Sequence, residues 1–153
     1  MSRAHAAPAR ALLRLENLAA SYGRAEVLSD LSLFVGSAEA VVILGRNGAG
    51  KSTVLKAVMG LEVERRGRIL FDGLEIQDMP THRIAQGGIG YVPEDRRIFA
   101  TLSVRENLAV ARRRVSHDEK AWLEADVWQL FPPLEAIAER RAGFLSGGEQ
   151  QML

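Results

Sequence analysis

Nine consecutive residues have the composition of a loop that holds phosphate. In order they are Gly45, Arg46, Asn47, Gly48, Ala49, Gly50, Lys51, Ser52 and Thr53. The spacing is Gly, four residues, then Gly, Lys and Ser. Glycines let the backbone curl so that successive N–H groups point at one anion, and a helix that begins at Lys51 adds its N-terminal positive charge. We therefore predict that residues 45–53 bind phosphate.

Two side chains at the end of this loop predict what carries the phosphate. Lys51 is expected to bridge β- and γ-phosphate oxygens, and the hydroxyl of Ser52 is expected to ligate Mg²⁺. At average glycine usage, the four fixed positions should match by chance in only about one chain in a few hundred. The loop also follows an apolar run and opens a helical pattern, as phosphate binding requires. The sequence thus predicts a bound nucleotide with Mg²⁺.

A second glycine-containing motif lies about 95 residues beyond Lys51. Its residues are Leu145, Ser146, Gly147, Gly148, Glu149 and Gln150. Ser146 can cap a helix, and the two glycines allow a phosphate to approach free N–H groups. Alone, this pattern would indicate an ordinary capped helix. Together with the phosphate loop, it resembles the signature sequence of ATP-binding cassette (ABC) ATPases.

The resemblance covers residues 13–153 and implies partners. In that family the signature of one subunit completes the ATP site of the other, so residues 145–150 would bind ATP in trans within a homo- or heterodimer. Tyr22 resembles the aromatic residue that stacks on adenine in the family. Without the resemblance, Tyr22 would be read as a half-buried strand residue. Membrane permease subunits are further expected partners, and no nucleic acid is.

The segment 89–99 lies where the family keeps its Q-loop. Most members have glutamine at the position of Glu94, which in the family touches Mg²⁺ and the attacking water. A carboxylate can take that role, so Glu94 is the Q-loop equivalent and joins Ser52 as a metal candidate. No residue is assigned a catalytic role. The alternative is that Glu94 and Asp95 form a solvated turn. Val-Pro-Glu followed by Arg-Arg-Ile-Phe resembles the smaller ATPase of bacterial branched-chain amino acid importers.

The hydrophobic pattern predicts the strands that must position these motifs. Alternating apolar residues indicate strands at 13–18 and 31–35. The continuous run 41–44 is typical of a strand buried on both faces, directly before the phosphate loop. Asp72-Gly73 between apolar stretches predicts a hairpin with a type I′ turn. A further strand is predicted at 89–92.

Helices are predicted mainly in the second part of the chain. Capping patterns start at Ser103 and Ser116, a helix is expected over 117–131, and a last one begins at Ser146. Leu123, Val127 and Leu130 share a helical face and are expected to line a core. The fold class is α/β: a P-loop ABC ATPase core with an antiparallel β subdomain and an inserted helical subdomain, its C-terminal part missing. We divide the chain into a disordered tail, 1–11, and a partial nucleotide-binding domain, 12–153, with the helical subdomain at about 100–145.

Composition excludes several classes of protein. The 153 residues include 20 basic and 19 acidic side chains, which gives a net charge of +1 and no electrostatic case for nucleic acid. Cysteine is absent, so disulfides and thiolate chemistry are excluded. No apolar run approaches the ~20 residues of a membrane span. We expect a cytoplasmic chain, peripheral on the inner face of the plasma membrane; an organellar transit peptide in the Arg- and Ala-containing N-terminus is the alternative to a frayed tail.

The sequence stops at Leu153 inside the helix that the signature opens. In the family, the next elements supply an Asp that supports Mg²⁺, a Glu that polarises water and a switch histidine, and no residue here matches them. We therefore expect a truncated cassette that binds ATP but hydrolyses it negligibly alone. The favoured function is an ATP-binding, energy-coupling subunit of a branched-chain amino acid importer. The alternatives are a non-transport ABC ATPase and a catalytically dead nucleotide-binding fragment.

Overall fold

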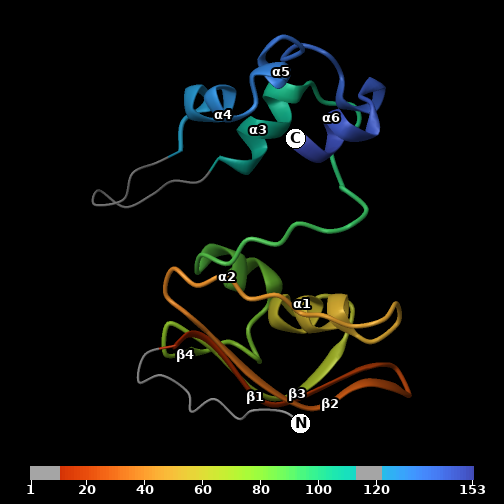
Figure 1. Ribbon diagram of the computed structural model, residues 1–153, viewed down its shortest axis with the longest axis vertical. Coiled ribbons are helices and arrows are strands. Elements are labelled where there is room, and N and C mark those ends of the chain that lie inside the picture. Colours follow the sequence, from red (N-terminus) through yellow and green to blue (C-terminus); the bar gives the residue numbers. More distant parts are fainter. Residues whose placement is uncertain (1–10, 113–121) are drawn as a thin grey trace. The chain divides into compact units, whose positions relative to one another are not determined.

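The computed structural model describes residues 11–112 and 122–153 (Figure 1). The chain divides into two compact units, one up to Tyr91 and one from Val92 to Leu153, and each is described by itself. The predicted tail, except for Ala11, lies outside the described residues. Ala11 is the first residue of a strand.

An antiparallel sheet forms the base of the first unit. Its strands are β1 (Ala11–Tyr22), β2 (Ala25–Gly36), β3 (Glu64–Phe71) and β4 (Leu74–Glu75). Their order is β2-β1-β3-β4, so β1 and β3 are central. The predicted hairpin is present: Phe71 pairs with Leu74, and both Asp72 (φ 46°) and Gly73 (φ 80°) have the positive φ of a type I′ turn.

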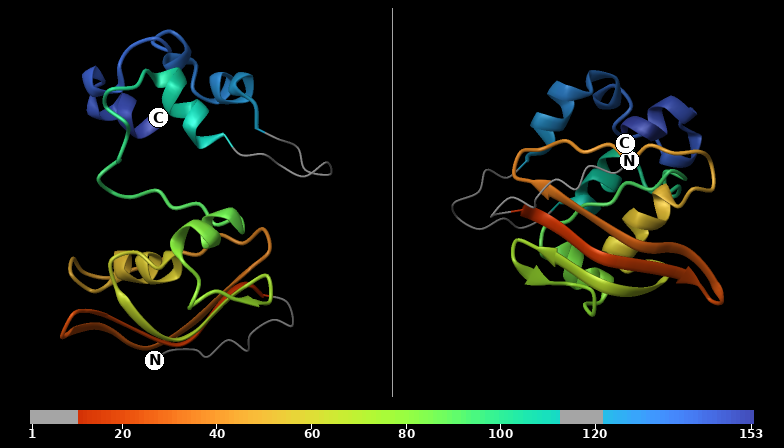
Figure 2. Two further views of the ribbon diagram at one scale, coloured as in Figure 1. Left: turned by 180° about the vertical axis from the view of Figure 1, so that it is seen from behind. Right: turned by 60° about the horizontal axis from the view of Figure 1, so that its bottom comes forward.

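Two helices cover one face of this sheet, α1 (Lys51–Met59) and α2 (Thr81–Gln86) (Figures 1 and 2). Helix α1 ends at Gly60, whose φ of 67° gives the left-handed C-cap that glycine adopts without strain. Buried side chains from strands and helices form one core; the largest are Leu15, Leu18, Ile69 and Ile84. The α/β class is therefore confirmed, and α1 is anchored to the sheet directly behind the phosphate loop.

Two predicted strands do not form. Residues 41–44 and 89–92 have no strand hydrogen bonding, and Val42 and Leu44 are 76% and 86% exposed. The physical reason is that a strand needs a neighbour to complete its hydrogen-bond ladder. Among the described residues, every strand of the sheet is antiparallel and none lies beside either run. Ile89 and Tyr91 still pack against the core of the first unit.

The second unit is built from short helices. They are α3 (Val104–Ala111), α4 (Glu124–Leu130), α5 (Pro132–Glu135), the 3₁₀ helix η1 (Ala142–Phe144) and α6 (Gly147–Met152). Helix α3 begins with the predicted capping box, in which Ser103 and Glu106 exchange hydrogen bonds. The predicted cap at Ser116 and the start of the helix expected over 117–131 lie outside the described residues; the described part begins at Glu124.

The predicted apolar face of α4 was wrong in two of its three residues. Leu123 and Leu130 are 51% and 59% exposed, whereas Val127 is partly buried against the core. Trp128 is the buried residue instead. Its indole N–H donates to Glu124 and its ring lies under the guanidinium of Arg105, so the bulky ring is covered and its polar atom is satisfied.

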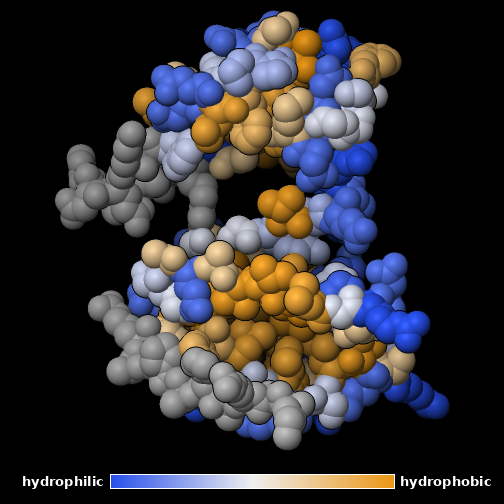
Figure 3. Space-filling view, in the orientation of Figure 1, coloured by the Kyte–Doolittle hydropathy of each residue, from blue (hydrophilic) through white to orange (hydrophobic). Residues whose placement is uncertain are grey.

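Apolar side chains also reach the surface of the first unit, where Figure 3 shows them gathered over a broad area. The large exposed apolar residues of this unit include Val41, Val42, Leu44, Leu55 and Leu74. In the part of the chain that the structure describes, no helix has the length and apolar character needed to cross a membrane.

Candidate phosphate-binding site

The phosphate loop connects residues 41–44, of which Ile43 packs against the core, to the first turn of α1. Lys51 folds back over it, and its Nζ donates to the carbonyl oxygens of Gly45 and Arg46 at 3.0 and 2.9 Å. A turn hydrogen bond of 3.1 Å from the N–H of Ala49 to the carbonyl of Arg46 closes the loop. The ammonium is therefore held at the centre of the loop, where a bound phosphate could replace the two carbonyls as its partner.

Glycine is required at Gly50 for two independent reasons. Its φ is 84°, a left-handed conformation that costs a residue with a Cβ about 1–2 kcal/mol. A Cβ there would also lie 2.8 Å from Cδ2 of Leu28 and 3.3 Å from Cγ1 of Val27. Gly48 also has a positive φ, of 80°, but open space around it. The sequence pattern thus has a direct geometric basis, and Gly50 packs the loop against β2.

The N-terminus of α1 presents donors to the same place. The first bond of the helix runs from the N–H of Val54 to the carbonyl of Gly50, at 3.1 Å. The N–H groups of the three preceding residues, 51–53, therefore have no acceptor within the helix. No acidic residue occupies the first turn. This arrangement favours an anion, because free N–H groups and the helix dipole act together.

The donor set also fits Mg²⁺ bound through a phosphate. Ser52 is exposed at the start of α1, and its hydroxyl is the kind of hard oxygen ligand that Mg²⁺ accepts. Mg²⁺ usually retains waters and takes few protein ligands when phosphates are present. Across residues 11–112 and 122–153, no cluster of three or more His, Cys, Asp or Glu side chains could hold a metal ion by itself. Ser52 would therefore bind the ion together with the nucleotide.

Tyr22 lies at the end of β1 nearest to this loop. It pairs with Ala25 across the hairpin, and Val27, two residues further along β2, packs against Gly50. Two residues of strand span roughly 7 Å, so the ring belongs to the same edge of the first unit as the loop. The Tyr22 residue is 40% exposed, which leaves ring surface for a ligand.

Sequence reasoning missed Lys56, which contacts the predicted site. Its ammonium lies 5.8 Å from the centroid of the Tyr22 ring and 2.6 Å from a carboxylate oxygen of Glu62. The available signal was its position five residues after Lys51, on the helix that follows the loop. Only Lys51 was singled out because Lys56 belongs to no motif.

The signature motif begins α6 in the second unit. Ser146 caps this helix: its Oγ accepts from the N–H of Glu149 at 3.3 Å, and its own N–H donates to the Glu149 carboxylate at 2.6 Å. Gln150 donates to the carbonyl of Leu145 at 3.1 Å. A Cβ on Gly147 would lie 3.1 Å from the guanidinium of Arg96. The predicted cap is therefore present, and the exposed Gly148 follows in open space.

The hydrogen bond from Ser146 also affects the ionisation of Glu149. This backbone N–H is the main cause that lowers the pKa of the Glu149 carboxyl below its ordinary value, and the Ser146 hydroxyl adds to it. Arg140 lies 3.6 Å away and acts in the same direction. Glu149 is therefore held as a carboxylate at the start of α6.

Glu94 is exposed and belongs to an irregular segment of the second unit. The same segment contains an ion pair of 2.9 Å between Arg97 and Asp95, and Arg96 and Arg97 have positive φ angles of 63° and 31°. Ser52 belongs to the first unit. A Mg²⁺ shared by Ser52 and Glu94, like the trans role of residues 145–150, therefore stays a prediction.

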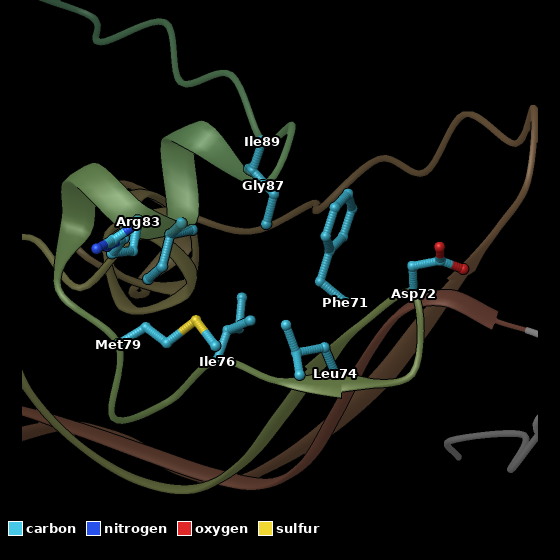
Figure 4. Close-up of a pocket in the computed structure, with 9 residues that line it drawn as sticks. Phe71, Asp72, Leu74, Ile76, Met79, Arg83, Gly87 and Ile89 are labelled. Atoms are coloured by element: carbon cyan, nitrogen blue, oxygen red, sulfur yellow. The ribbon is translucent and has the colours of Figure 1, made fainter. Parts of the chain in front are cut away.

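A cavity of about 310 Å³ lies elsewhere in the first unit, between β3, β4 and α2 (Figure 4). Its lining is mainly apolar and consists of Phe71, Asp72, Leu74, Ile76, Met79, Arg83, Ile84, Gly87 and Ile89. The charged ends of Asp72 and Arg83 point away from its centre (Figure 4). None of the predicted site residues lines it, so the candidate site is the exposed loop and not this cavity.

The sequence of the chain is similar to those of known ATP-binding proteins over more than nine-tenths of its length. The family profile described as ABC transporter matches residues 28–153. This chain belongs to the ABC transporter family. It is 39% identical over 142 residues to the high-affinity branched-chain amino acid transport ATP-binding protein BraG of Pseudomonas aeruginosa, covering 93% of this chain and 61% of BraG.

A second relative is named for a different role. The lipopolysaccharide export system ATP-binding protein LptB of Haemophilus influenzae is 39% identical over 143 residues, covering 92% of this chain and 59% of LptB. The chain thus spans about 60% of the length of these two relatives. Identity alone does not separate the amino acid transport protein from the lipopolysaccharide export protein.

Solved structures show the same fold. The ATP binding subunit of an ABC transporter matches with a TM-score of 0.70 and 30% identity, over 92% of this chain and 58% of that one. A dimeric bacterial ABC transporter cassette matches with a TM-score of 0.76 at 23% identity, over 92% of this chain and 66% of that one. The expected ABC ATPase fold is thereby confirmed for this part of a cassette.

Proposed function

We propose that the chain binds Mg²⁺ and ATP at residues 45–53 as the ATP-binding, energy-coupling subunit of an ABC importer. The observation that carries the proposal is the position of the Lys51 ammonium, 3.0 and 2.9 Å from two loop carbonyls at the free N-terminus of α1. A phosphate in the loop would accept from the ammonium and from the helix N–H groups together. Few structural roles need a cation and free N–H groups at one point.

Each residue of the loop has a separate task in this proposal. Lys51 exchanges its carbonyl partners for β- and γ-phosphate oxygens, and Gly48 and Gly50 keep the backbone close to them. Ser52 holds Mg²⁺, which neutralises phosphate charge when bound. The ring of Tyr22 stacks on the adenine.

A second subunit completes the proposed assembly. Residues 145–150 would contact the ATP held by a partner cassette, while Glu94 would face the metal of its own site. Nucleotide binding would then close a dimer on membrane permease subunits at the inner face of the plasma membrane, and hydrolysis would reopen it. The 153-residue polypeptide alone is expected to bind ATP with negligible turnover, because no residue in it matches the family's water-polarising glutamate.

The proposed transport substrate is the branched-chain amino acids. The name of BraG supports it, as does that of the Archaeoglobus fulgidus protein LivF, a probable branched-chain amino acid transport ATP-binding protein that is 38% identical. Glu94 in place of glutamine is the sequence feature in its favour. LptB, at the same 39% identity as BraG, makes lipopolysaccharide export the second candidate.

Isothermal titration of the purified chain with ATP and Mg²⁺ tests nucleotide binding. We expect saturable binding that Lys51→Ala weakens at least tenfold, because a charge-assisted contact to phosphate contributes about 1.5–3 kcal/mol. Arg66→Ala is the matched control, since it removes one positive charge from an exposed position of the same unit. Equal binding by all three proteins, or no binding by any, would contradict the proposal.

Gene deletion in the source organism separates the two substrate candidates. Import predicts reduced uptake of labelled leucine, isoleucine and valine, with lipopolysaccharide export unchanged and uptake restored by the wild-type gene. A gene that carries Lys51→Ala should not restore the uptake. Loss of lipopolysaccharide export with normal amino acid uptake would instead favour the second candidate.

A further inference from the structure

Lys56 joins the two ends of the proposed nucleotide site through α1. This helix begins with Lys51 at the phosphate loop, and five residues further on Lys56 contacts the Tyr22 ring. Five residues of α-helix span roughly 7.5 Å. A ligand with phosphates at one end and a flat ring at the other would therefore meet two lysines of one rigid element.

The chain after α1 fixes the position of the Lys56 ammonium. Gly60 caps the helix in a left-handed conformation, and the N–H of Leu61 donates to the carbonyl of Lys56 at 2.9 Å. This reversal brings Glu62, itself at a φ of 59°, within 2.6 Å of Lys56 Nζ. The bond to Glu62 is the main cause that raises the pKa of Lys56 above its ordinary value. Lys56 is thus a held cation.

This cation occupies one side of the Tyr22 ring. A centroid distance of 5.8 Å is near the outer limit of a cation–π contact, and the Tyr22 hydroxyl also contributes to the raised pKa of Lys56, so the ammonium lies toward the hydroxyl side of the ring. The Tyr22 residue remains 40% exposed, so the ring has accessible surface besides the part that faces Lys56. This exposed part of Tyr22 is where a flat ligand would stack while the ammonium keeps its place.

We propose that Lys56 is a positioning residue for the nucleobase: its ammonium holds the Tyr22 ring from one side, and the base stacks on the exposed surface of the ring. The inference rests on the proposed function, because it assumes that phosphate binds at Lys51. Holding the ring before the ligand arrives reduces the side-chain entropy lost on binding. Removing the Lys56 charge should therefore weaken the binding of a ligand that carries a base and leave the binding of phosphates alone unchanged.

Titrations with two ligands, MgATP and magnesium tripolyphosphate, test whether Lys56 acts on the binding of the base. Tripolyphosphate occupies the loop but has no base to stack. Lys56→Met keeps most of the side-chain stem and removes the charge; we expect it to weaken ATP binding about two- to fivefold and to leave tripolyphosphate binding unchanged. Lys56→Arg should restore ATP binding, because a guanidinium also lies well over an aromatic face.

Two further variants separate the ring contact from general electrostatics. Arg24→Met removes a positive charge from an exposed residue of the same hairpin and should change both ligands little. Lys56→Met combined with Tyr22→Leu should weaken ATP binding no more than Tyr22→Leu alone, because both changes remove one interaction. This non-additivity would not arise from a merely structural role of Lys56.

The outcomes distinguish this inference from the function on which it rests. Equal weakening of ATP and tripolyphosphate by Lys56→Met would overturn it, since Lys56 would then act on the phosphates or on folding. Unchanged ATP binding would also overturn it. If the wild-type chain bound neither ligand, the proposed function would fail and the inference with it. Selective weakening of ATP, rescued by arginine, is the result that supports it.

Discussion

The guanidinium of Arg65 donates a hydrogen bond of 2.6 Å to the carbonyl oxygen of Ala57 in the last turn of α1. It also donates to the carbonyls of Val58, Ile76 and Met79 at 3.0–3.2 Å. One side chain of β3 thus satisfies carbonyls of a helix end, which lack partners inside the helix, and of the segment after β4. Partial burial lowers the pKa of Arg65 below its ordinary value, but guanidinium remains charged in proteins.

Replacing Arg65 should therefore destabilise the first unit. Arg65→Met leaves four carbonyls without a charged donor, and we expect a loss of about 2–4 kcal/mol in the free energy of unfolding. Urea denaturation followed by circular dichroism measures it. Arg66→Met is the matched control, because the neighbouring residue is exposed; its effect should stay within about 0.5 kcal/mol. Similar losses for both would show that the carbonyl contacts contribute little.

Asn107 should be equally important in the second unit. This buried residue accepts from the N–H of Phe99 at 2.9 Å and donates to the carbonyls of Phe99 and Ser103 at 3.1 and 2.8 Å. Asn107→Ala removes the acceptor of the Phe99 N–H, at about 1–3 kcal/mol, whereas the carbonyls of Phe99 and Ser103 keep the backbone N–H groups of Leu102 and residue 107 as partners. Thermal unfolding should show a lower Tm for it than for Val110→Ala, a change at a 58% exposed position of the same helix. An equal Tm for both variants would contradict the prediction.

Two glycines of the sheet should differ in their tolerance of a side chain. Both Gly67 (φ 96°) and Gly73 (φ 80°) lie in the left-handed region, where a Cβ costs about 1–2 kcal/mol. Only at Gly67 would the Cβ also meet backbone, 2.4 Å from the carbonyl oxygen of Asn17. Gly67→Ala should therefore lower the free energy of unfolding clearly more than Gly73→Ala. Equal losses would mean that the strand shifts to make room.

Local signals in the sequence predicted the parts of the fold that depend on few residues. The turn at Asp72-Gly73 and the caps at Ser103 and Ser146 need only positive φ or a side chain within three residues. The phosphate loop belongs to this group, because its glycines and Lys51 are contiguous. Such features can be read from the sequence without knowledge of distant contacts.

Other features depend on partners that are remote in sequence. Residues 41–44 have the composition of a buried strand, but no described strand supplies the ladder that would make them one. Trp128 is covered by Arg105 and bonded to Glu124, contacts that apolar periodicity does not register. Lys56 was missed for the same reason, since its importance arises from the ring of Tyr22 on another element. Apolar periodicity indicates which residues tend to be buried, but it does not identify the residues that pack against them.

The Glu149 carboxylate at the start of α6 should make the stability of the second unit sensitive to acid. Because the pKa of Glu149 is lowered in the folded chain, chiefly by the N–H of Ser146, its carboxylate stabilises the fold fully above the ordinary value of 4.5. That contribution is lost as pH falls through the lowered folded pKa. Glu149→Gln should therefore be less stable than the wild type at pH 7, and the difference should shrink steadily below pH 4.5. Unfolding curves of both proteins between pH 7 and pH 3 measure it, and a difference that stayed constant across this range would show that the Glu149 charge does not contribute.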